Sequence, residues 1–534
     1  MKEEKEVNGY QEEEENLGIS LLRKGRKGLA HAVFSRLGIV LLLLILQILL
    51  SVAVYYWLNS YLPHFMIVAL LFSTFMAIYI LNTDIDPTAK ITWLMVISLM
   101  PVVGAPLFCY TRSNFGMRML KKHYAYLVGV TQASISQNEQ VLDELKAEDP
   151  GAASLALYMH RTGGFPIYGG TDVKYYPLGE DKWADLLEAL ESAEHFIFLE
   201  YFIIDEGLMW GRVLEILARK AKEGVDVRVM YDGTCEFSTL PHDYPRRIRE
   251  LGIQCKMFAP MTPFVSTHYN YRDHRKIAVI DGHTAFTGGV NLADEYINHR
   301  PRFGHWKDTA IRLKGEGVRS FTLMFLQMWS INEKSLDIER FLEYPCPAPE
   351  NSRGYVLPYG DCPLDGDKVG ERVYMDILNR ARDYVYIMSP YLILDGEMET
   401  ALKFAAERGV DVRLVLPGIP DKKMPWALAK THYASLMASG VKLYEYTPGF
   451  VHAKVFVADD REAVVGTINL DYRSLYHHFE CAAFMYGTAC IPHIKADIEA
   501  TIALSAQVEK DFARREKLGL RLLGFFLKAF APLL

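Results

Sequence analysis

The hydrophobic positions of this chain follow two different patterns. Near the N-terminus they form long uninterrupted runs, at residues 37–58 and 65–81, each long enough to cross a bilayer as a helix. Beyond residue 160, short apolar stretches alternate with amphipathic ones, which is typical of strands alternating with helices. The pattern therefore predicts N-terminal transmembrane helices followed by a globular α/β part.

A third hydrophobic run covers residues 91–110 and differs from the first two. It contains Pro101 and Pro106, which break or kink a helix. We expect this run either to span the bilayer or to enter it and return on the same side. Together the runs predict a membrane domain over residues 37–110, followed by a connector over residues 111–160.

Basic residues beside these runs give conflicting signals about membrane orientation. The polar tail, residues 1–36, ends in a basic cluster formed by Arg23, Lys24, Arg26, Lys27 and Arg36. The positive-inside rule makes this tail cytoplasmic, so three full spans would leave the C-terminal part outside. A second basic group, which favours a cytoplasmic C-terminal part, follows the third run at Arg112, Arg118, Lys121 and Lys122. We favour a cytoplasmic C-terminal part and a re-entrant third run.

The last residues, 518–534, are rich in Leu and Phe, with Arg521 and Lys528 among them. This composition fits either a buried C-terminal helix or an amphipathic helix on a lipid surface. The hydrophobic runs upstream slightly favour the amphipathic helix.

The part of the chain beyond residue 160 repeats itself. The segment GVDVRVMYDG at residues 224–233 returns as GVDVRLVLPG at residues 409–418. An apolar stretch of strand length precedes each copy, at residues 196–204 and 384–391. The repeat predicts two similar α/β sandwich domains related by a pseudo-twofold axis.

The repeat also sets the expected domain boundaries. The first domain is predicted over residues 161–342 and the second over residues 371–534, which includes the C-terminal helix. A stretch rich in Pro, Gly and Asp, residues 343–370, is the predicted linker between them.

Each half carries one copy of a His-x-Lys-x4-Asp motif. The copies consist of His274, Lys276 and Asp281 in the first half and His452, Lys454 and Asp459 in the second. In a strand, residues i and i+2 point to the same face, so each His projects together with its Lys. Glycines follow each motif and permit close approach of the backbone.

These residue types suit chemistry at a phosphate. Two imidazoles on opposite sides of one phosphate fit a double displacement, in which one attacks and the other protonates the leaving oxygen. The lysines, with the amides of Asn291 and Asn469, would stabilise the negative charge. Asp281 and Asp459 are expected to orient or charge-stabilise a histidine. No metal or other cofactor is expected, because the lysines supply the positive charge.

Net charge and cysteine content argue against some classes of protein. The formal net charge of −7 argues against a nucleic-acid partner, since such proteins usually carry a basic surface. The seven cysteines are scattered, with no Cys-x-x-Cys pair, so neither a zinc site nor a disulfide framework is indicated.

The paired motifs resemble the phospholipase D superfamily, and the surrounding residues resemble its bacterial cardiolipin synthase branch. The resemblance covers nearly the whole chain. Besides the motifs, it is carried by Trp93–Gly104, Glu200–Phe202, Phe286–Asn291, Ser389–Tyr391, Val465–Ser474 and Phe479–Glu480.

This resemblance implies two phospholipase D-like domains in a multi-pass protein of the bacterial cell membrane. The implied reaction condenses two phosphatidylglycerols into cardiolipin and glycerol through a phosphatidyl-histidine. It implies His274 as nucleophile and His452 as general acid, although the residues alone leave the reverse order open. It also places Asp308 and Glu480 beside the histidine of the opposite half.

Two positions depart from the family pattern. The family usually has Asn before the Phe-Glu pair, whereas this chain has His478, preceded by His477. The family's Arg before the first acidic residue is Lys307 here. Both positions are candidates for contact with the lipid head group.

Three other functions compete with cardiolipin synthesis. A phospholipase D or another phosphatidyltransferase would use water or a different alcohol as acceptor, and the sequence separates these poorly. The acidic charge and the membrane runs weigh against a nuclease. A non-enzymatic scaffold would be expected to have lost one motif, and both are intact. The expected partners are phosphatidylglycerol and membrane lipid, and homo-oligomerisation stays open.

Overall fold

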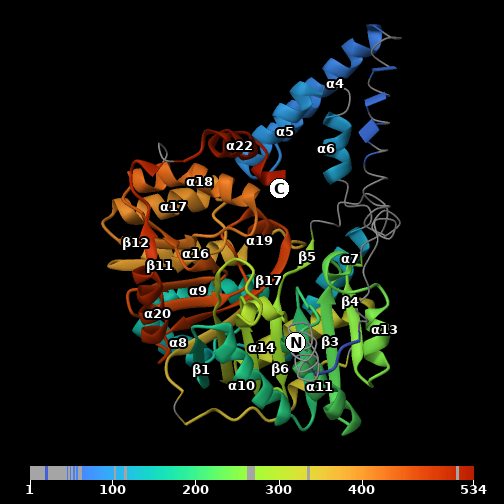
Figure 1. Ribbon diagram of the computed structural model, residues 1–534, viewed down its shortest axis with the longest axis vertical. Helices are drawn as coiled ribbons and strands as arrows, with labels where there is room; N and C mark the ends of the chain where they lie inside the picture. The colour runs from blue at the N-terminus through green and yellow to red at the C-terminus, as the bar shows by residue number, and fades with distance from the viewer. Residues whose placement is uncertain are drawn as a thin grey trace, which may run out of the picture.

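The computed structural model shows an α/β protein built on two mixed sheets, one from each half of the repeat (Figure 1). The predicted tail lies outside the described residues apart from 18–21, as does most of the first hydrophobic run. The structure describes residues 18–21, isolated positions between 45 and 57, and residues 63–100, 104–112, 117–260, 271–333, 337–350, 352–512 and 516–533.

The first sheet has seven strands in the order β1-β9-β7-β6-β2-β3-β4. Strands β2, β3 and β4 run parallel, whereas β6, β7, β9 and β1 pair antiparallel. The bounds are β1 Thr171–Tyr176, β2 Phe196–Tyr201, β3 Asp226–Asp232, β4 Gln254–Phe258, β6 Lys276–Ile280, β7 Thr284–Gly288 and β9 Ala310–Gly315.

The second sheet repeats this order as β10-β17-β16-β15-β11-β12-β13, with β18 added at the edge. Each strand occupies the place of its counterpart in the first sheet, so the repeat seen in the sequence is a repeat in space. The bounds are β10 Tyr355–Asp361, β11 Tyr384–Met388, β12 Asp411–Pro417, β13 Lys442–Tyr446, β15 Val455–Ala458, β16 Glu462–Gly466, β17 His478–Tyr486 and β18 Ser505–Gln507.

Short strands tie the two halves together reciprocally. In the first half β5, Arg272–Asp273, pairs with the start of β17 in the second half. In the second half β14, Gly449–Val451, pairs with β8, His305–Lys307, in the first half. Since β5 and β14 each lead directly into a His-x-Lys motif, each motif is held by a strand from the opposite half.

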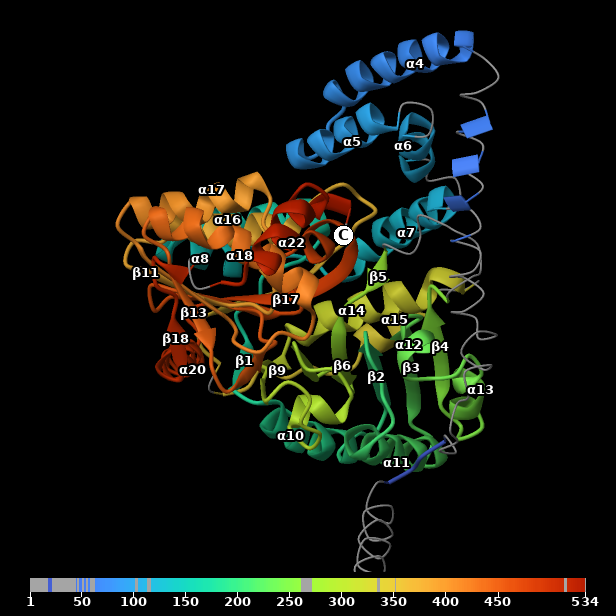
Figure 2. The same cartoon turned by 45° about the horizontal axis from the view of Figure 1, so that its top comes forward.

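Helices cover both faces of each sheet. In the first half α10 and α11 lie on one face and α14 on the other (Figure 2), and in the second half α16, α17 and α18 lie opposite α20. The bounds are α10 Gly179–Glu191, α11 Leu208–Lys222, α12 Cys235–Ser238, α13 Tyr244–Arg249, α14 Val318–Trp329, α15 Glu339–Leu342, α16 Val369–Arg380, α17 Gly396–Glu407, α18 Lys423–Ala438, α19 Tyr472–Tyr476 and α20 Ile491–Ala503.

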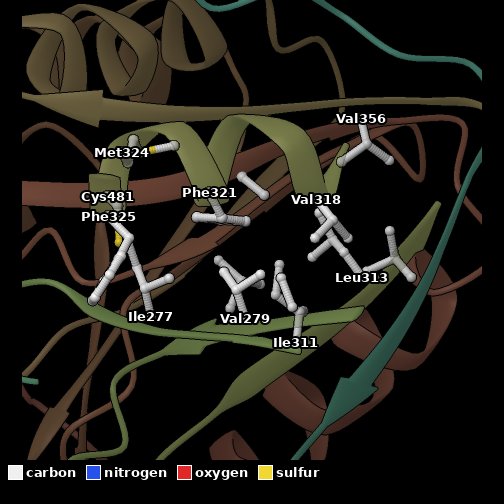
Figure 3. Close-up of a cluster of buried hydrophobic side chains, with 14 of the residues drawn as sticks. Ile277, Val279, Ile311, Leu313, Val318, Phe321, Met324, Phe325, Val356 and Cys481 are labelled. Carbon is white, nitrogen blue, oxygen red and sulfur yellow. The ribbon is translucent and has the colours of Figure 1, made fainter. Parts of the chain in front are cut away.

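Helix α14 forms the centre of the core between the two halves. Its apolar side chains pack on the first sheet and also meet strands of the second, because nearly every residue of the helix is buried. Figure 3 shows this contact between Val318, Phe321, Met324 and Phe325 of the helix and Ile277, Val279, Ile311, Leu313, Val356 and Cys481 of the strands. The apolar face of β6, directly after His274, is therefore fixed by packing.

The connector and the linker differ from the expectation. Helices α8, Glu139–Glu148, and α9, Pro150–Gly163, lie in the predicted connector, yet they pack in the core of the second half against α16. The predicted linker, residues 343–370, contains β10, which is a full strand of the second sheet. An amphipathic helix shows in its sequence that one face is buried, but it does not show against which sheet.

Helices α4, Pro63–Leu81, α5, Pro87–Leu99, and α6, Gly104–Arg112, contact one another, and α7, Met117–Thr131, follows them. The third hydrophobic run is divided between α5 and α6. Gly104 allows the two helices to meet closely, because a Cβ there would lie 2.8 Å from the Cα of Ile97. None of the helices in the described ranges is both long and apolar enough to cross a membrane.

Candidate active site

His274 lies between β5 and β6 and is held by the second half of the chain. Its backbone N–H donates to the carbonyl of Phe479 at 2.9 Å. Its ring Nδ1 lies 2.9 Å from each carboxylate oxygen of Glu480, the next residue of β17. Both side chains are buried, and Glu480 is fully enclosed. The β5–β17 pairing therefore sets the orientation of this imidazole.

His452 repeats the arrangement with the halves exchanged. Its backbone N–H donates to the carbonyl of Lys307 at 2.7 Å, and its ring Nδ1 lies 2.7 Å from Oδ2 of Asp308. Gly289 makes room for this pair, because a Cβ there would lie 1.9 Å from Oδ1 of Asp308. The acidic partners expected from the family resemblance thus sit beside the histidines of the opposite halves.

Burial decides the charge of the two imidazoles. It lowers the pKa of His274 well below the usual value, although the Glu480 carboxylate opposes the shift. Burial and the nearby Lys454 charge lower the pKa of His452 to about 4, against the pull of Asp308. Each ring is therefore neutral at neutral pH.

The two carboxylates fix the tautomer of each ring. Burial favours the neutral form of Glu480, but the hydrogen-bonding His274 outweighs it and holds the pKa of Glu480 below its usual range. His452 and Lys454 do the same for the pKa of Asp308, which burial alone would raise. An ionised carboxylate accepts the Nδ1–H of each ring, which leaves the lone pair on Nε2.

The two lysines of the motifs lie beside their histidines, as the strand spacing predicts. Nζ of Lys276 donates to the carbonyl of His274 at 2.6 Å, and Nζ of Lys454 donates to the carbonyl of His452. Burial lowers the pKa of Lys276 to about 8 and that of Lys454 to about 7. The positive charge near the histidines is therefore largest on the acidic side of neutrality.

The two asparagines are less alike than the repeat suggests. Asn291 accepts from the N–H of Ile203 at 3.0 Å and donates to the hydroxyl of Tyr296 at 2.8 Å. Within the described part of the chain, Oδ1 of Asn469 has no hydrogen-bond partner. Asn291 therefore braces the loop after β2, and one of its amide hydrogens remains for another acceptor.

The expectation for Asp281 and Asp459 is wrong. Both lie at the far ends of β6 and β15 with positive φ, and neither contacts a histidine of the motifs. Asp281 accepts from the backbone N–H groups of residues 194–196 at 2.7–2.8 Å, and Asp459 accepts from those of residues 382–384 at 2.7–2.9 Å. A strand advances about 3.3 Å per residue, so the x4 spacing carries each Asp away from its His. These carboxylates fix the starts of β2 and β11 instead.

Several further side chains lie beside the histidines. The ring of Phe202 lies 4.8 Å from that of His274, and the ring of Tyr296 lies 5.4 Å from that of His452. His478 lies 5.3 Å from His274, again between ring centres. The family resemblance drew attention to Phe202 and His478, whereas Tyr296 had no signal in the sequence, because it lies far from His452 along the chain.

Lys307, one of the departures from the family pattern, is engaged within the protein. Its ammonium lies 2.7 Å from a carboxylate oxygen of Asp497 on α20 and also donates to the carbonyl of Pro177. It links the two halves beside Asp308, so it supports the position of that carboxylate.

Comparison with known proteins identifies the family. A family model described as cardiolipin synthase, PLD-like domain, matches residues 186–302 and 374–502. The cardiolipin synthase of Halalkalibacterium halodurans is 33% identical over 506 residues, which cover 94% of this chain and 100% of that protein. The chain belongs to the cardiolipin synthase family of the phospholipase D superfamily. As a member of this family it is a phosphatidyltransferase of the phospholipase D type.

Two further relatives define the range of this similarity. A protein of Streptococcus mutans that is described as uncharacterized is 56% identical over 457 residues, covering 86% of this chain and 99% of that protein. Among solved structures, the phosphatidylserine synthase of Haemophilus influenzae matches 68% of this chain and 93% of its own, with a TM-score of 0.54. At 14% identity that match shows a shared fold.

Proposed function

We propose that this chain is a cardiolipin synthase that transfers a phosphatidyl group from one phosphatidylglycerol to another. The observation that carries the proposal is the reciprocal pairing of His274 with Glu480 and of His452 with Asp308. It gives one centre two neutral imidazoles, each with a fixed Nδ1–H and an Nε2 lone pair. The first half, residues 161–342, would contribute His274, and the second half, which includes β10 from Tyr355 onwards, would contribute His452.

In the first step, Nε2 of His274 attacks the phosphorus of one phosphatidylglycerol. A P–N bond forms while the P–O bond to the head-group glycerol breaks, and His452 donates its proton to that oxygen. Because the pKa of His452 is about 4 without substrate, the bound phosphodiester anion must raise it, so that Nε2 of His452 takes up a proton from solvent before it can donate one. Lys276 and Lys454 stabilise the charge on the phosphoryl oxygens.

In the second step, His452 is neutral and takes a proton from a head-group hydroxyl of the second phosphatidylglycerol. That oxygen attacks phosphorus, the P–N bond breaks, and cardiolipin leaves with both imidazoles restored. Water at the same position would give phosphatidic acid, so the outcome depends on which acceptor fills the site.

An exposed apolar surface supports a membrane location. Figure 1 shows α4, α5, α6 and α22, Leu518–Lys528, at one end of the molecule. Helix α22 packs on α18 through Gly524 and leaves Phe525 and Phe526 exposed at 72% and 64%. On α4, Leu71 and Phe75 are exposed at 66% and 63%. Apolar exposure on this scale is typical of contact with lipid.

A cavity beneath this surface comes close to the segment that carries the site. It has a volume of about 930 Å³ and lies between α5 and the second half of the chain. Its lining includes Tyr271, Tyr476 and His477, and His477 directly precedes His478 beside His274. We propose that phosphatidylglycerol enters along this cavity.

Contacts of the N-terminal tail support a cytoplasmic catalytic part. Residues 18–21 lie against the first half: the N–H of Ile19 donates to Gly211 of α11 at 3.3 Å, and the N–H of Leu21 donates to Glu206 at 2.8 Å. Arg247 donates to the carbonyl of Leu21 at 2.7 Å. Because the basic cluster that follows predicts a cytoplasmic tail, we propose that the catalytic part lies on the same side.

Purified protein incubated with phosphatidylglycerol as the sole lipid tests this function. Cardiolipin and glycerol should appear in equal amounts, and neither should form with His274→Ala or His452→Ala. Phosphatidic acid without cardiolipin would show that water is the acceptor and would overturn the proposal. Substantial turnover by either variant would exclude a centre shared between the two histidines.

A further inference from the structure

His478 is a third imidazole, beside His274, and the mechanism above does not use it. It begins β17 and is only 8% exposed. Within the described residues, neither of its ring nitrogens makes a hydrogen bond. Leaving such a buried polar group without a partner is unfavourable in a folded protein. Its position is therefore better explained by a ligand than by packing.

The surroundings of His478 supply two further ligand groups. His274, His478 and Glu480 can each offer one atom so that the three atoms lie within 4.8 Å of one another. A carboxylate oxygen of Glu480 lies 2.9 Å from Nδ1 of His274 and 3.7 Å from Nδ1 of His478. Tetrahedral Zn²⁺ with bonds of about 2.0–2.1 Å keeps its ligand atoms about 3.4 Å apart, between these two distances.

We propose that His274, His478 and Glu480 bind a divalent transition-metal ion of the zinc type, and that this ion inhibits phosphatidyl transfer. Two imidazoles and one carboxylate form a donor set that zinc prefers and that magnesium and calcium do not. The fourth position would be filled by water or by a phosphate oxygen of the lipid.

The ion would inhibit the enzyme because it would occupy atoms that the reaction needs. An ion on Glu480 and Nδ1 of His274 takes the Nδ1 lone pair, so the ring proton moves to Nε2 and the carboxylate no longer accepts from the ring. Nε2 then has no lone pair with which to attack phosphorus. This consequence rests on the proposed function, whereas binding of the ion does not.

The neighbouring charges are compatible with a cation. Lys276 opposes one, but its ammonium already donates to the carbonyl of His274. Asp471 is a buried acidic residue near His478, and burial raises the pKa of its carboxyl. Asparagine, which the family usually carries at position 478, is a poorer zinc ligand than imidazole.

Titration of the metal-free, full-length protein with Zn²⁺ and Co²⁺ tests the site. We expect one ion per chain, with Co²⁺ absorption bands typical of tetrahedral coordination. His478→Asn should weaken binding at least tenfold. His477→Asn is the matched control, because it makes the same exchange at the adjacent residue outside the ligand group, and it should bind as the wild type does. Equal affinity of His478→Asn and wild type would overturn the site.

Two further measurements distinguish failure of the metal site from failure of the inhibition and of the proposed function. X-ray absorption of the zinc-loaded wild type should show two imidazole ligands, and an all-oxygen shell would overturn the site even if His478→Asn does not fold. Zn²⁺ should inhibit cardiolipin formation at the concentration at which it binds. Binding without inhibition would refute the regulatory half of the proposal. A protein inactive on phosphatidylglycerol would contradict the proposed function, while the titration would still decide the metal site.

Discussion

Replacing Glu480 with Gln tests the reciprocal arrangement at one atom pair. The exchange keeps the size of the side chain but removes its charge, within 2.9 Å of Nδ1 of His274. Thr467 also donates to this carboxylate, so the group has little freedom to move away. If the new amide turns its NH₂ towards the ring, Nδ1 must accept and the proton moves to Nε2. The nucleophilic lone pair is then lost.

The expected loss of activity combines two effects. Exchanging a charge-assisted hydrogen bond for a neutral one removes about 1–2 kcal/mol of transition-state stabilisation, which lowers the rate by roughly a factor of 5–30. Reversal of the tautomer should lower the rate further. In a serine protease, replacing the carboxylate beside the catalytic histidine with an amide lowers kcat about 10⁴-fold. We therefore expect Glu480→Gln to lower kcat by about 10²–10⁴-fold with little change in KM.

The assay is the rate of cardiolipin formation from phosphatidylglycerol in mixed micelles, with folding checked by thermal unfolding. Glu462→Gln is a suitable control, because Glu462 is another buried carboxylate of the same sheet that pairs with Arg380 away from the histidines. It should retain wild-type kcat. A Glu480→Gln protein within about threefold of wild type would refute the proposed role of the carboxylate.

Three other predictions follow from the same structure. Asp281→Ala should reduce the free energy of unfolding by about 3 kcal/mol, seen in denaturant titration, without changing kcat, because it breaks only bonds to the backbone of β2. The plot of kcat/KM against pH should fall as the pH rises above about 4, because His452 must carry a proton to act as general acid and its pKa in the free enzyme is about 4, and it should fall more steeply above about pH 7 as Lys454 loses its charge; a plot that rises towards neutral pH would contradict this. Cysteines placed at Ser20 and at Glu407, an exposed position of α17 in the catalytic part, should react with impermeant reagents from the same side of the membrane, and reaction from opposite sides would contradict the proposed topology.

The repeat allowed the sequence to predict the sheets and the core of the site. Paired His-x-Lys spacings in apolar strands require the imidazole and ammonium to project together, and Lys276 and Lys454 do so. The acidic partners Glu480 and Asp308 were expected only through the family resemblance. Their positions depend on β5–β17 and β14–β8 pairing between halves, which no local pattern encodes.

The predictions that the structure contradicts have a common physical origin. Asp281 and Asp459 belong to the motif in sequence, but the length of a strand separates each of them from its histidine. Their carboxylates accept hydrogen bonds from the backbone at the starts of the neighbouring strands. Helices α8 and α9 lie in the predicted connector, and amphipathic periodicity indicates that a helix has a buried face but not which sheet that face packs against. The unsatisfied ring of His478 is likewise visible only once β17 is placed beside β5.

The central claim is that His274 and His452 form one centre in which His274 carries the phosphatidyl group. Rapid acid quenching of the enzyme during turnover of labelled phosphatidylglycerol, followed by peptide mass spectrometry, tests it most directly. We predict one phosphatidyl adduct per chain, located on His274 and absent from His274→Ala. An adduct on His452 would reverse the two roles, and the absence of any adduct in an actively turning-over enzyme would contradict the double-displacement mechanism.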